Sequence, residues 1–152
     1  PKLNFNLKLV KLKREKPEYK NLKYKKILSY LSKMDNSKSD IALVSNNRLL
    51  ETGTSNLLFV KDQKFFTPKK GYYEGNTYKF FKTKIRKIIK KDILLKEIKK
   101  YDEILLIGSG KGVASVRTIN EIKWKRKNLE KFNILSKHYH AVMNKCNSYK
   151  FK

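Results

Sequence analysis

The sequence has a single cysteine, Cys146, and only 6 glycines and 3 prolines among its 152 residues. One cysteine excludes a disulfide within the chain and suits a reducing compartment, so we expect a cytoplasmic protein. No apolar run approaches the roughly 20 residues that a membrane-spanning helix needs, and no signal-peptide pattern opens the chain. These shortages argue against a disulfide-stabilised secreted domain and against an integral helical membrane protein.

Acidic residues are also scarce, because 13 Asp and Glu face 38 Lys and Arg, which gives a formal net charge of +25. Such an excess ordinarily indicates a nucleic acid or an anionic membrane as partner. Here the charge is nearly all lysine and is spread from Lys2 to Lys152, and asparagine, isoleucine, tyrosine and phenylalanine are abundant too. An AT-rich genome over-uses these residues, so codon bias can supply the charge. A nucleic-acid-binding module is therefore kept as an alternative and not as the first interpretation.

The hydrophobic pattern predicts one domain, since 39% hydrophobic residues suffice for a core in a chain of this length. Alternating or short apolar runs predict strands, and stripes with a period of 3.6 predict helices. The predicted strands cover residues 3–9, 41–44, 49–53, 56–60, 64–68, 103–108 and 113–119, and the predicted helices cover residues 22–34, 78–90, 95–99 and 128–146. Runs of strands with helices between them predict an α+β fold with a mixed or antiparallel sheet and flanking helices.

Three of the few glycines, Gly108, Gly110 and Gly112, crowd into the segment GSGKG between two apolar runs. Glycine allows backbone N–H groups to approach an anion closely. The segment does not fit a P-loop, and it does not fit the dinucleotide fingerprint, whose third glycine would stand where Val113 is. Gly75–Thr77, at the start of a predicted helix, is a second candidate anion-binding turn. From these residues alone, an ordinary glycine turn between two strands remains open.

Four blocks of sequence stand in a recognisable order. They are YKNLKY, ETGTSNLLF followed by FFTP, EGNTYKFF and EILLIGSGKGVASVRTI, and they cover most of the chain from Tyr19 to Ile119. In these blocks the chain resembles the class IV aminotransferases, which are the fold-type-IV pyridoxal-phosphate enzymes, and ETGTSNLLF with FFTP is the most specific block. The resemblance implies the large C-terminal domain of these enzymes, pyridoxal 5'-phosphate as cofactor, no metal, a small-molecule substrate and a homodimer.

Carried over to the matching positions, the resemblance implies a role for each of several residues. Lys20 resembles the catalytic lysine that forms the Schiff base with the cofactor. Glu51 resembles the carboxylate that faces the pyridine nitrogen and keeps it protonated, so that the ring withdraws electrons. Tyr24 resembles the tyrosine that bonds the phenolic oxygen of the cofactor. Taken singly, Lys20 would be a solvated surface lysine and Glu51 an ordinary carboxylate at a strand end.

The two candidate anion-binding turns receive roles from the same resemblance. Asn76 and Thr77 resemble the residues that hold the cofactor phosphate at a helix N-terminus. Ser109 stands where the family usually has a threonine for the same phosphate. Ser109 and Gly110 would also offer amides to a substrate carboxylate. The crowding of glycines is thus interpreted as a place where backbone amides meet a phosphate and a carboxylate.

Two departures from the family pattern affect this interpretation. The family has a small N-terminal domain before the catalytic lysine, which supplies an arginine for the phosphate, whereas this chain begins at Pro1, shortly before Lys20. We therefore expect residues 1–152 to be the cofactor-binding domain alone, in a chain that is a fragment with its own activity in doubt. The second departure is Lys111 inside the glycine turn, for which we expect a solvated side chain.

Among the subfamilies the blocks look most like aminodeoxychorismate lyase. In that reaction Lys20 would remove a proton, pyruvate would leave, and 4-aminobenzoate would be formed for folate synthesis. Transamination of branched-chain or D-amino acids would use the same lysine and carboxylate and is the first alternative. A basic nucleic-acid-binding module and an inactive fragment are the further alternatives.

Overall fold

The computed structural model describes residues 3–17 and 24–147. The strands are β1 (Phe5–Lys11), β2 (Ser39–Ser45), β3 (Arg48–Thr52), β4 (Asn56–Lys61), β5 (Lys64–Pro68), β6 (Ile88–Lys91), β7 (Ile93–Leu94), β8 (Glu103–Gly108), β9 (Gly112–Ile119) and β10 (Trp124–Lys125). The helices are α1 (Lys25–Leu31), α2 (Asn76–Lys84) and α3 (Glu130–Asn147), with the short 3-10 helices η1 (Leu95–Lys100) and η2 (Asn120–Ile122).

The strands form one mixed sheet of ten strands within the described residues, in the order β6-β5-β4-β8-β9-β1-β2-β3-β7, with β10 paired to β9. β1 runs parallel to both β2 and β9, and β5 runs parallel to β6, while the other neighbours are antiparallel. The predicted α+β class with a mixed sheet and flanking helices is confirmed. β9 lies between β8 and β1 and so joins the two halves of the sheet.

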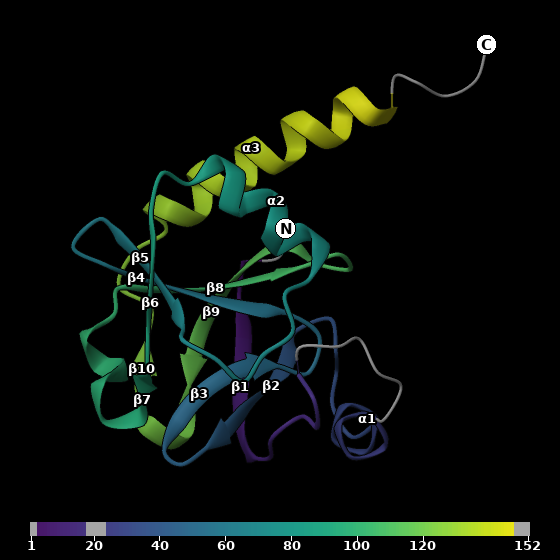
Figure 1. The fold of residues 1–152 in the computed structure, drawn as a ribbon, viewed down its shortest axis with the longest axis vertical. Coiled ribbons are helices and arrows are strands. Elements are labelled where there is room, and N and C mark those ends of the chain that lie inside the picture. The colour runs from purple at the N-terminus through teal and green to yellow at the C-terminus, as the bar shows by residue number, and fades with distance from the viewer. Residues whose placement is uncertain (1–2, 18–23, 148–152) are drawn as a thin grey trace.

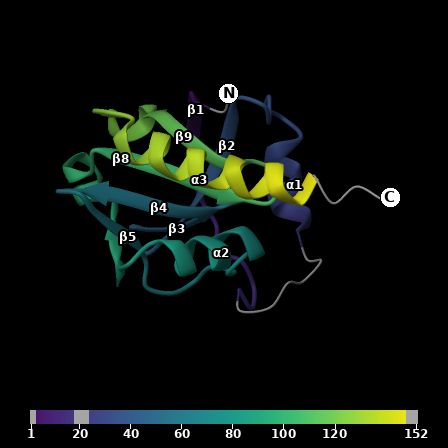
Figure 2. The same ribbon diagram turned by 90° about the horizontal axis from the view of Figure 1, so that it is seen from above.

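The sheet curls around its largest hydrophobic cluster, because strands far apart in the sheet order, such as β4 and β3, contribute to the same cluster. Helices α2 and α3 cover the outside of one half, over β4 and β8, and α1 packs outside the other half, against β1 and β2 (Figure 1; Figure 2). Strands in this arrangement are buried on both faces. That explains why the runs NLLFV and EILLIG are continuously apolar instead of alternating.

The division of side chains between the two faces is clear in β4. Leu57 and Phe59 point into the main core, whereas Leu58 and Val60 pack with α2 and α3. Phe59 stacks in a tilted arrangement on Tyr101, with ring centroids 5.1 Å apart. The same alternation in β2 and β8 connects the central core to both helical layers, and it fixes the strand ends that carry the candidate site.

The predicted helix over residues 78–90 is wrong in its second half. Helix α2 ends at Lys84, where Ile85 has an extended backbone (φ −89°, ψ 122°). Ile88 and Ile89 then belong to β6 and pair in parallel register with Phe65 and Phe66. The apolar spacing of this segment fits a helix, but its β-branched residues gain more by completing the edge of the sheet next to β5.

The other predicted helices keep their positions with changed detail. The segment 95–99 forms the 3-10 helix η1, and the long C-terminal helix runs over Glu130–Asn147. Of the predicted helix over residues 22–34, the structure gives Lys25–Leu31, and residues 22 and 23 lie outside the described part. Among the helices that the structure describes, none has both the length and the hydrophobicity needed to cross a bilayer.

Candidate functional site

A cavity of about 240 Å³ opens where the end of β3, the turn after β8 and the start of α2 meet. We call it the glycine-turn pocket. Its lining includes four of the residues singled out in the sequence, namely Tyr24, Glu51, Asn76 and Ser109. Folding therefore brings residues from four separate segments to one cavity. A cavity into which polar and charged side chains converge is a candidate site for a polar small molecule.

Three other predicted site residues, Thr77, Gly110 and Lys20, are not among the described lining residues of the glycine-turn pocket. Thr77 is the second residue of α2 and follows the lining residue Asn76 directly. Gly110 follows the lining residue Ser109, and a Cβ added to it would meet no atom within 4 Å. Lys20, the expected catalytic lysine, lies outside the described residues. Its predicted role therefore stays a prediction.

Glu51 reaches the glycine-turn pocket because β3 contains a bulge. Leu49 pairs with Val44 of β2 and Glu51 pairs with Leu43, so Leu50 is an extra residue in the ladder. Bulges of this kind redirect side chains and are common beside functional sites. The Glu51 side chain is buried, with 4% of its area exposed.

The charge of Glu51 is set by burial and by one arginine. Nε of Arg14 lies 2.7 Å from Oε1 of Glu51, and the N–H of Tyr73 donates to Oε2 at 3.4 Å. Burial raises the pKa of Glu51 to about 7, although the charge of Arg14 and the N–H of Tyr73 both lower it. Near neutral pH this carboxyl group can therefore hold or release a proton.

Arg14 also connects Glu51 to Tyr24. Its Nη1 donates to the hydroxyl oxygen of Tyr24 at 2.8 Å, and its guanidinium carbon lies 4.6 Å from the centre of the Tyr24 ring. The sequence analysis missed Arg14 because the run KREK has the composition of a solvated surface. One signal was present: Arg14 is an arginine in a chain whose charge is nearly all lysine, and arginine is preferred for buried ion pairs.

Asn56 and Tyr73, which the sequence analysis also missed, fix the entry to α2. The side chain of Asn56 donates to the carbonyl oxygen of Tyr73 at 2.6 Å and accepts from the N–H of Gly75 at 3.0 Å. Gly75 is the N-cap of α2, and no side chain caps this end. The helix start predicted at Gly75–Thr77 is confirmed, since α2 begins at Asn76. The first N–H groups of α2 are thus left for other acceptors.

Close packing explains two glycines of the turn between β8 and β9. A Cβ on Gly108 would lie 2.8 Å from Oγ of Ser55 and 3.0 Å from the carbonyl oxygen of Thr54. Gly112 has a φ of +66°, and its Cβ would lie 2.5 Å from Cε1 of Tyr139 on α3. Bare backbone at these positions is therefore needed for the turn to approach both the β3–β4 turn and α3.

The expectation of a solvated Lys111 is wrong. Its Nζ lies 2.9 Å from Oδ2 of Asp40 and also donates to Oγ1 of Thr54, and only 11% of its side chain is exposed. Asp40 is fully buried and accepts from the hydroxyl groups of Thr52 and Thr54 at 2.8 and 2.6 Å. A buried carboxylate attracts the nearest flexible cation, since an unpaired charge there would be costly. The ion pair fastens the glycine turn to β2, and the hydrogen bond to Thr54 fastens it to the β3–β4 turn, which forms a wall of the pocket.

Comparison with protein families gives one match to this chain. Residues 4–119, which include all described lining residues of the glycine-turn pocket, match the family described as amino-transferase class IV. A comparison with curated protein sequences finds no significant match.

Solved structures share the fold over most of the chain. A 4-amino-4-deoxychorismate lyase from Pseudomonas aeruginosa has a TM-score of 0.67 at 17% identity and covers 96% of this chain and 55% of its own. A branched-chain aminotransferase from Thermoproteus uzoniensis, solved with norvaline, has a TM-score of 0.76 at 14% identity, with coverages of 93% and 52%. A branched-chain amino acid aminotransferase from Thermobaculum terrenum, in its pyridoxal-phosphate form, has a TM-score of 0.75 at 17% identity and covers 91% of this chain and 50% of its own.

The chain spans about half the length of the proteins that it matches. At these identities the structural likeness shows the fold alone.

Proposed function

Because the chain belongs to the amino-transferase class IV family, we propose that it forms the cofactor-binding domain of a pyridoxal-phosphate enzyme. The observation that carries this proposal is the convergence of Tyr24, Glu51, Asn76 and Ser109 on the glycine-turn pocket. Pyridoxal phosphate, when bound, supplies a ring that withdraws electrons from a substrate carbon. The solved relative in its pyridoxal-phosphate form supports the same cofactor.

The geometry around Glu51 fits the pyridine end of this cofactor. Oε1 of Glu51 lies 2.7 Å from Nε of the charged Arg14 side chain, and this contact lowers the pKa of Glu51 against the effect of burial. A carboxylate oxygen has two lone pairs, so a ring N–H would be a further donor to this group. Glu51 would hold the proton of a ring nitrogen at Oε1, with Arg14 favouring the ionised carboxylate.

The other residues of the pocket would orient the remaining groups of the cofactor. The hydroxyl oxygen of Tyr24 accepts from Arg14, so its own O–H can donate to a phenolic oxygen. The N–H groups at Asn76 and Thr77, together with the hydroxyl of Ser109, would bind the phosphate. The amides of Ser109 and Gly110 would bind a substrate carboxylate. Lys20 would move the proton at the reacting carbon.

For the reaction we propose the release of pyruvate from 4-amino-4-deoxychorismate, which leaves 4-aminobenzoate for folate synthesis. The sequence blocks and the likeness to a lyase from Pseudomonas aeruginosa support it. The likeness to two branched-chain aminotransferases supports amino-group transfer from a branched-chain or D-amino acid as the second candidate. The single cysteine supports a cytoplasmic location. The family resemblance supports a homodimer whose subunits include an N-terminal part like that of the family.

The first experiment measures cofactor binding. Purified protein is incubated with pyridoxal phosphate, its absorbance spectrum is recorded, and borohydride reduction followed by peptide mass analysis locates any fixed cofactor. We expect the cofactor on Lys20, none on the Lys20→Ala variant, and an unchanged spectrum for Lys25→Ala, which removes an exposed lysine of α1. Equal labelling of the wild type and Lys20→Ala would contradict the assignment of Lys20.

The second experiment separates the two reactions. The loaded protein is supplied with 4-amino-4-deoxychorismate, and pyruvate and 4-aminobenzoate are measured. A parallel reaction supplies a branched-chain or D-amino acid with a 2-oxo acid and measures the new amino acid. Release of pyruvate supports the lyase, and amino-group transfer alone supports the transaminase. Cofactor binding without either product supports the inactive fragment.

A further inference from the structure

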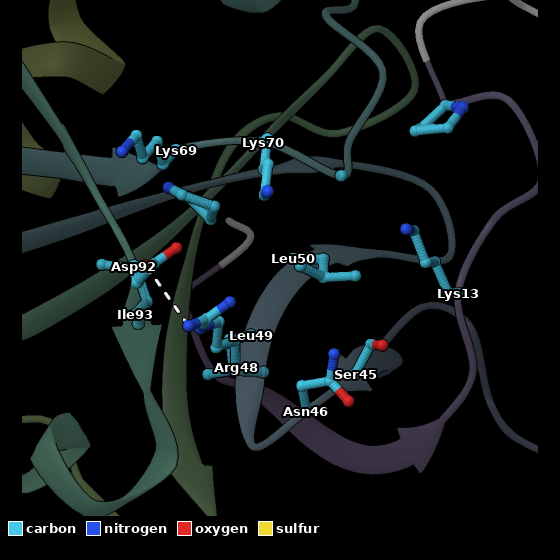
Figure 3. A pocket seen from close by; sticks show the side chains of 13 residues that line it. Lys13, Ser45, Asn46, Arg48, Leu49, Leu50, Lys69, Lys70, Asp92 and Ile93 are labelled. Atoms are coloured by element: carbon cyan, nitrogen blue, oxygen red, sulfur yellow. Dashed lines mark ion pairs between the residues drawn. The ribbon is translucent and has the colours of Figure 1, made fainter.

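A second cavity, of about 300 Å³, opens beside β3 between the β2–β3 turn and the segment that follows β5. We call it the lysine pocket, because four of its lining residues are cations, namely Lys13, Arg48, Lys69 and Lys70. Asp92 is the one carboxylate among its described lining residues. In Figure 3, Lys13 and Lys70 lie on opposite sides of Leu50, and Arg48 and Asp92 are joined on a third side.

The cations of the lysine pocket are poorly neutralised. Nη2 of Arg48 lies 3.5 Å from Oδ2 of Asp92. Within residues 3–17 and 24–147, no carboxylate lies within ion-pair distance of Lys13, Lys69 or Lys70. Among the residues that the structure describes, the cavity therefore carries a surplus of positive charge.

Arg48 is only partly exposed in the lysine pocket. Its Nε is buried and has no hydrogen-bond partner among the described residues. Buried N–H groups in folded proteins nearly always find an acceptor, so one without a partner calls for an explanation. Nε itself is closed off from the cavity, so a ligand in the lysine pocket would reach the exposed part of this guanidinium group instead. The guanidinium group presents a planar set of donors that matches the oxygens of a phosphate or a carboxylate.

The walls of the lysine pocket are held in place by backbone packing. Gly71 has a φ of +85°, and a Cβ added to it would lie 3.0 Å from Cδ2 of Leu50. This close approach holds the segment of Lys69 and Lys70 against β3. On the opposite rim, Asn46 has a positive φ of 50° in the tight β2–β3 turn. A concave site between fixed walls concentrates an electrostatic field more strongly than a flat surface of the same charge does.

We propose that the lysine pocket binds a small organic dianion of the phosphate-ester or pyrophosphate class. Arg48 would bind the oxygens through paired N–H groups, and Lys13 and Lys70 would act as point charges from the two sides. The cavity volume lies at the small end of the range for small-molecule sites, so a whole metabolite fits and a polymer does not. The proposal goes beyond the proposed function, because Tyr24, Glu51, Asn76 and Ser109, which are expected to bind the cofactor, line the other pocket.

The test is a titration of the whole chain with inorganic pyrophosphate, followed through backbone amide signals in NMR. We expect shifts at Asn46–Arg48 and Lys69–Gly71. A second set of shifts at the glycine turn would report binding at the expected phosphate site of the glycine-turn pocket and is fitted separately. Failure of the lysine pocket is thus distinguishable from failure of the proposed cofactor site.

Matched variants decide whether the lysine pocket or the overall charge attracts the anion. The Lys13→Gln/Lys70→Gln double variant should weaken pyrophosphate binding at this pocket about tenfold or more, because charge-assisted hydrogen bonds are lost. The control, Lys125→Gln/Lys137→Gln, removes the same charge at exposed positions of β10 and α3 and should change the affinity less than about twofold. Arg48→Lys keeps the charge, loses the fork and should also weaken binding.

Two outcomes would overturn the proposal. Equal weakening in the two double variants would show that pyrophosphate senses only the net charge of the chain. Tighter binding of a short single-stranded oligodeoxynucleotide, with shifts spread beyond the lysine pocket and lost steeply with salt, would assign these lysines to a nucleic-acid surface instead. Pyrophosphate shifts confined to the lysine pocket and abolished by Lys13→Gln/Lys70→Gln would establish it.

Discussion

The two pockets beside β3 handle charge in opposite ways. In the glycine-turn pocket the Arg14 and Glu51 side chains are 6% and 4% exposed and lie against each other. In the lysine pocket Lys13 and Lys70 are exposed. Arg48 pairs with the one carboxylate among the described lining residues, Asp92, at the longer distance of 3.5 Å. Yet consecutive residues line the two cavities, since Leu50 belongs to one and Glu51 to the other.

This difference separates charge that belongs to the fold from charge that is available to a ligand. Buried partners cost much when one of them is removed, because the other is left without solvent. Exposed cations cost little to remove, since water and salt already screen them. Substitutions of the charged residues of the glycine-turn pocket should therefore change stability, whereas substitutions of the exposed lysines of the lysine pocket should change binding alone.

The largest effect should come from Lys111→Met. This change leaves the fully buried Asp40 without its cation, and breaking a buried pair typically costs about 3–5 kcal/mol. Urea unfolding of the variant should show this loss. The Lys111→Met/Asp40→Asn double variant should recover part of it, since no buried charge is then unpaired. A loss below about 1 kcal/mol in the single variant would mean that this ion pair contributes no more to stability than an exposed surface pair does.

Glu51→Gln should change how stability depends on pH. The pKa of Glu51 rises from 4.5 in the unfolded chain to about 7 in the fold, so between these values the folded state holds more protons. Wild-type stability should therefore fall as pH rises from about 4.5 to 7, and the variant should lack this contribution.

The difference amounts to at most about 3 kcal/mol, at about 1.4 kcal/mol per pH unit. Urea unfolding curves of both proteins at several pH values would measure it. The variant leaves Arg14 unpaired at every pH, so the slope and not the absolute stability is the readout. Parallel profiles for the two proteins would contradict the raised pKa.

Two glycine substitutions compare the walls of the pockets directly. Gly112→Ala combines a positive φ of 66° with a clash against the ring of Tyr139 and should cost about 2–3 kcal/mol. Gly71→Ala has a positive φ of 85° and a milder contact with a leucine methyl group, so about 1–2 kcal/mol is expected. Thermal unfolding would rank the two. The reverse order would mean that Tyr139 moves aside more easily than Leu50.

The smallest effect on stability should come from Lys70→Gln. Lys70 is exposed and has no carboxylate partner among the described residues, so the change should stay within about 0.5 kcal/mol. Unfolding in urea would check this. A clear loss of stability would show that the lysine pocket, like its neighbour, is built on charges that the fold requires.

Much of the fold follows from local patterns. In an alternating strand or a helix with one apolar stripe, the sequence itself shows which face is buried and which faces solvent. The strand at β1 and the long helix α3 are such cases. The segment after Lys84 is different, since its isoleucines fit a helix locally and become a strand only because β5 offers a free edge.

The candidate site divides in the same way. Glu51, Asn76 and Ser109 lie in sequence blocks that are distinctive enough to be recognised without a structure. Arg14 and Lys111 could not be recognised, because their roles come from buried carboxylates that are distant in sequence. A side chain that is fixed by a remote partner leaves no local pattern in a chain as rich in lysine as this one.

The ion pair of Lys111 with Asp40 joins residues 71 positions apart. In the folded chain β9, which follows the glycine turn, lies between β8 and β1 and pairs Val116 with Phe5. A contact between residues so far apart in sequence requires closing a long loop, which costs conformational entropy before the contact can stabilise the fold. The described residues that line the glycine-turn pocket and fasten its wall extend from Arg14 to Lys111, so a chain still being synthesised lacks the complete pocket until residue 111 has left the ribosome.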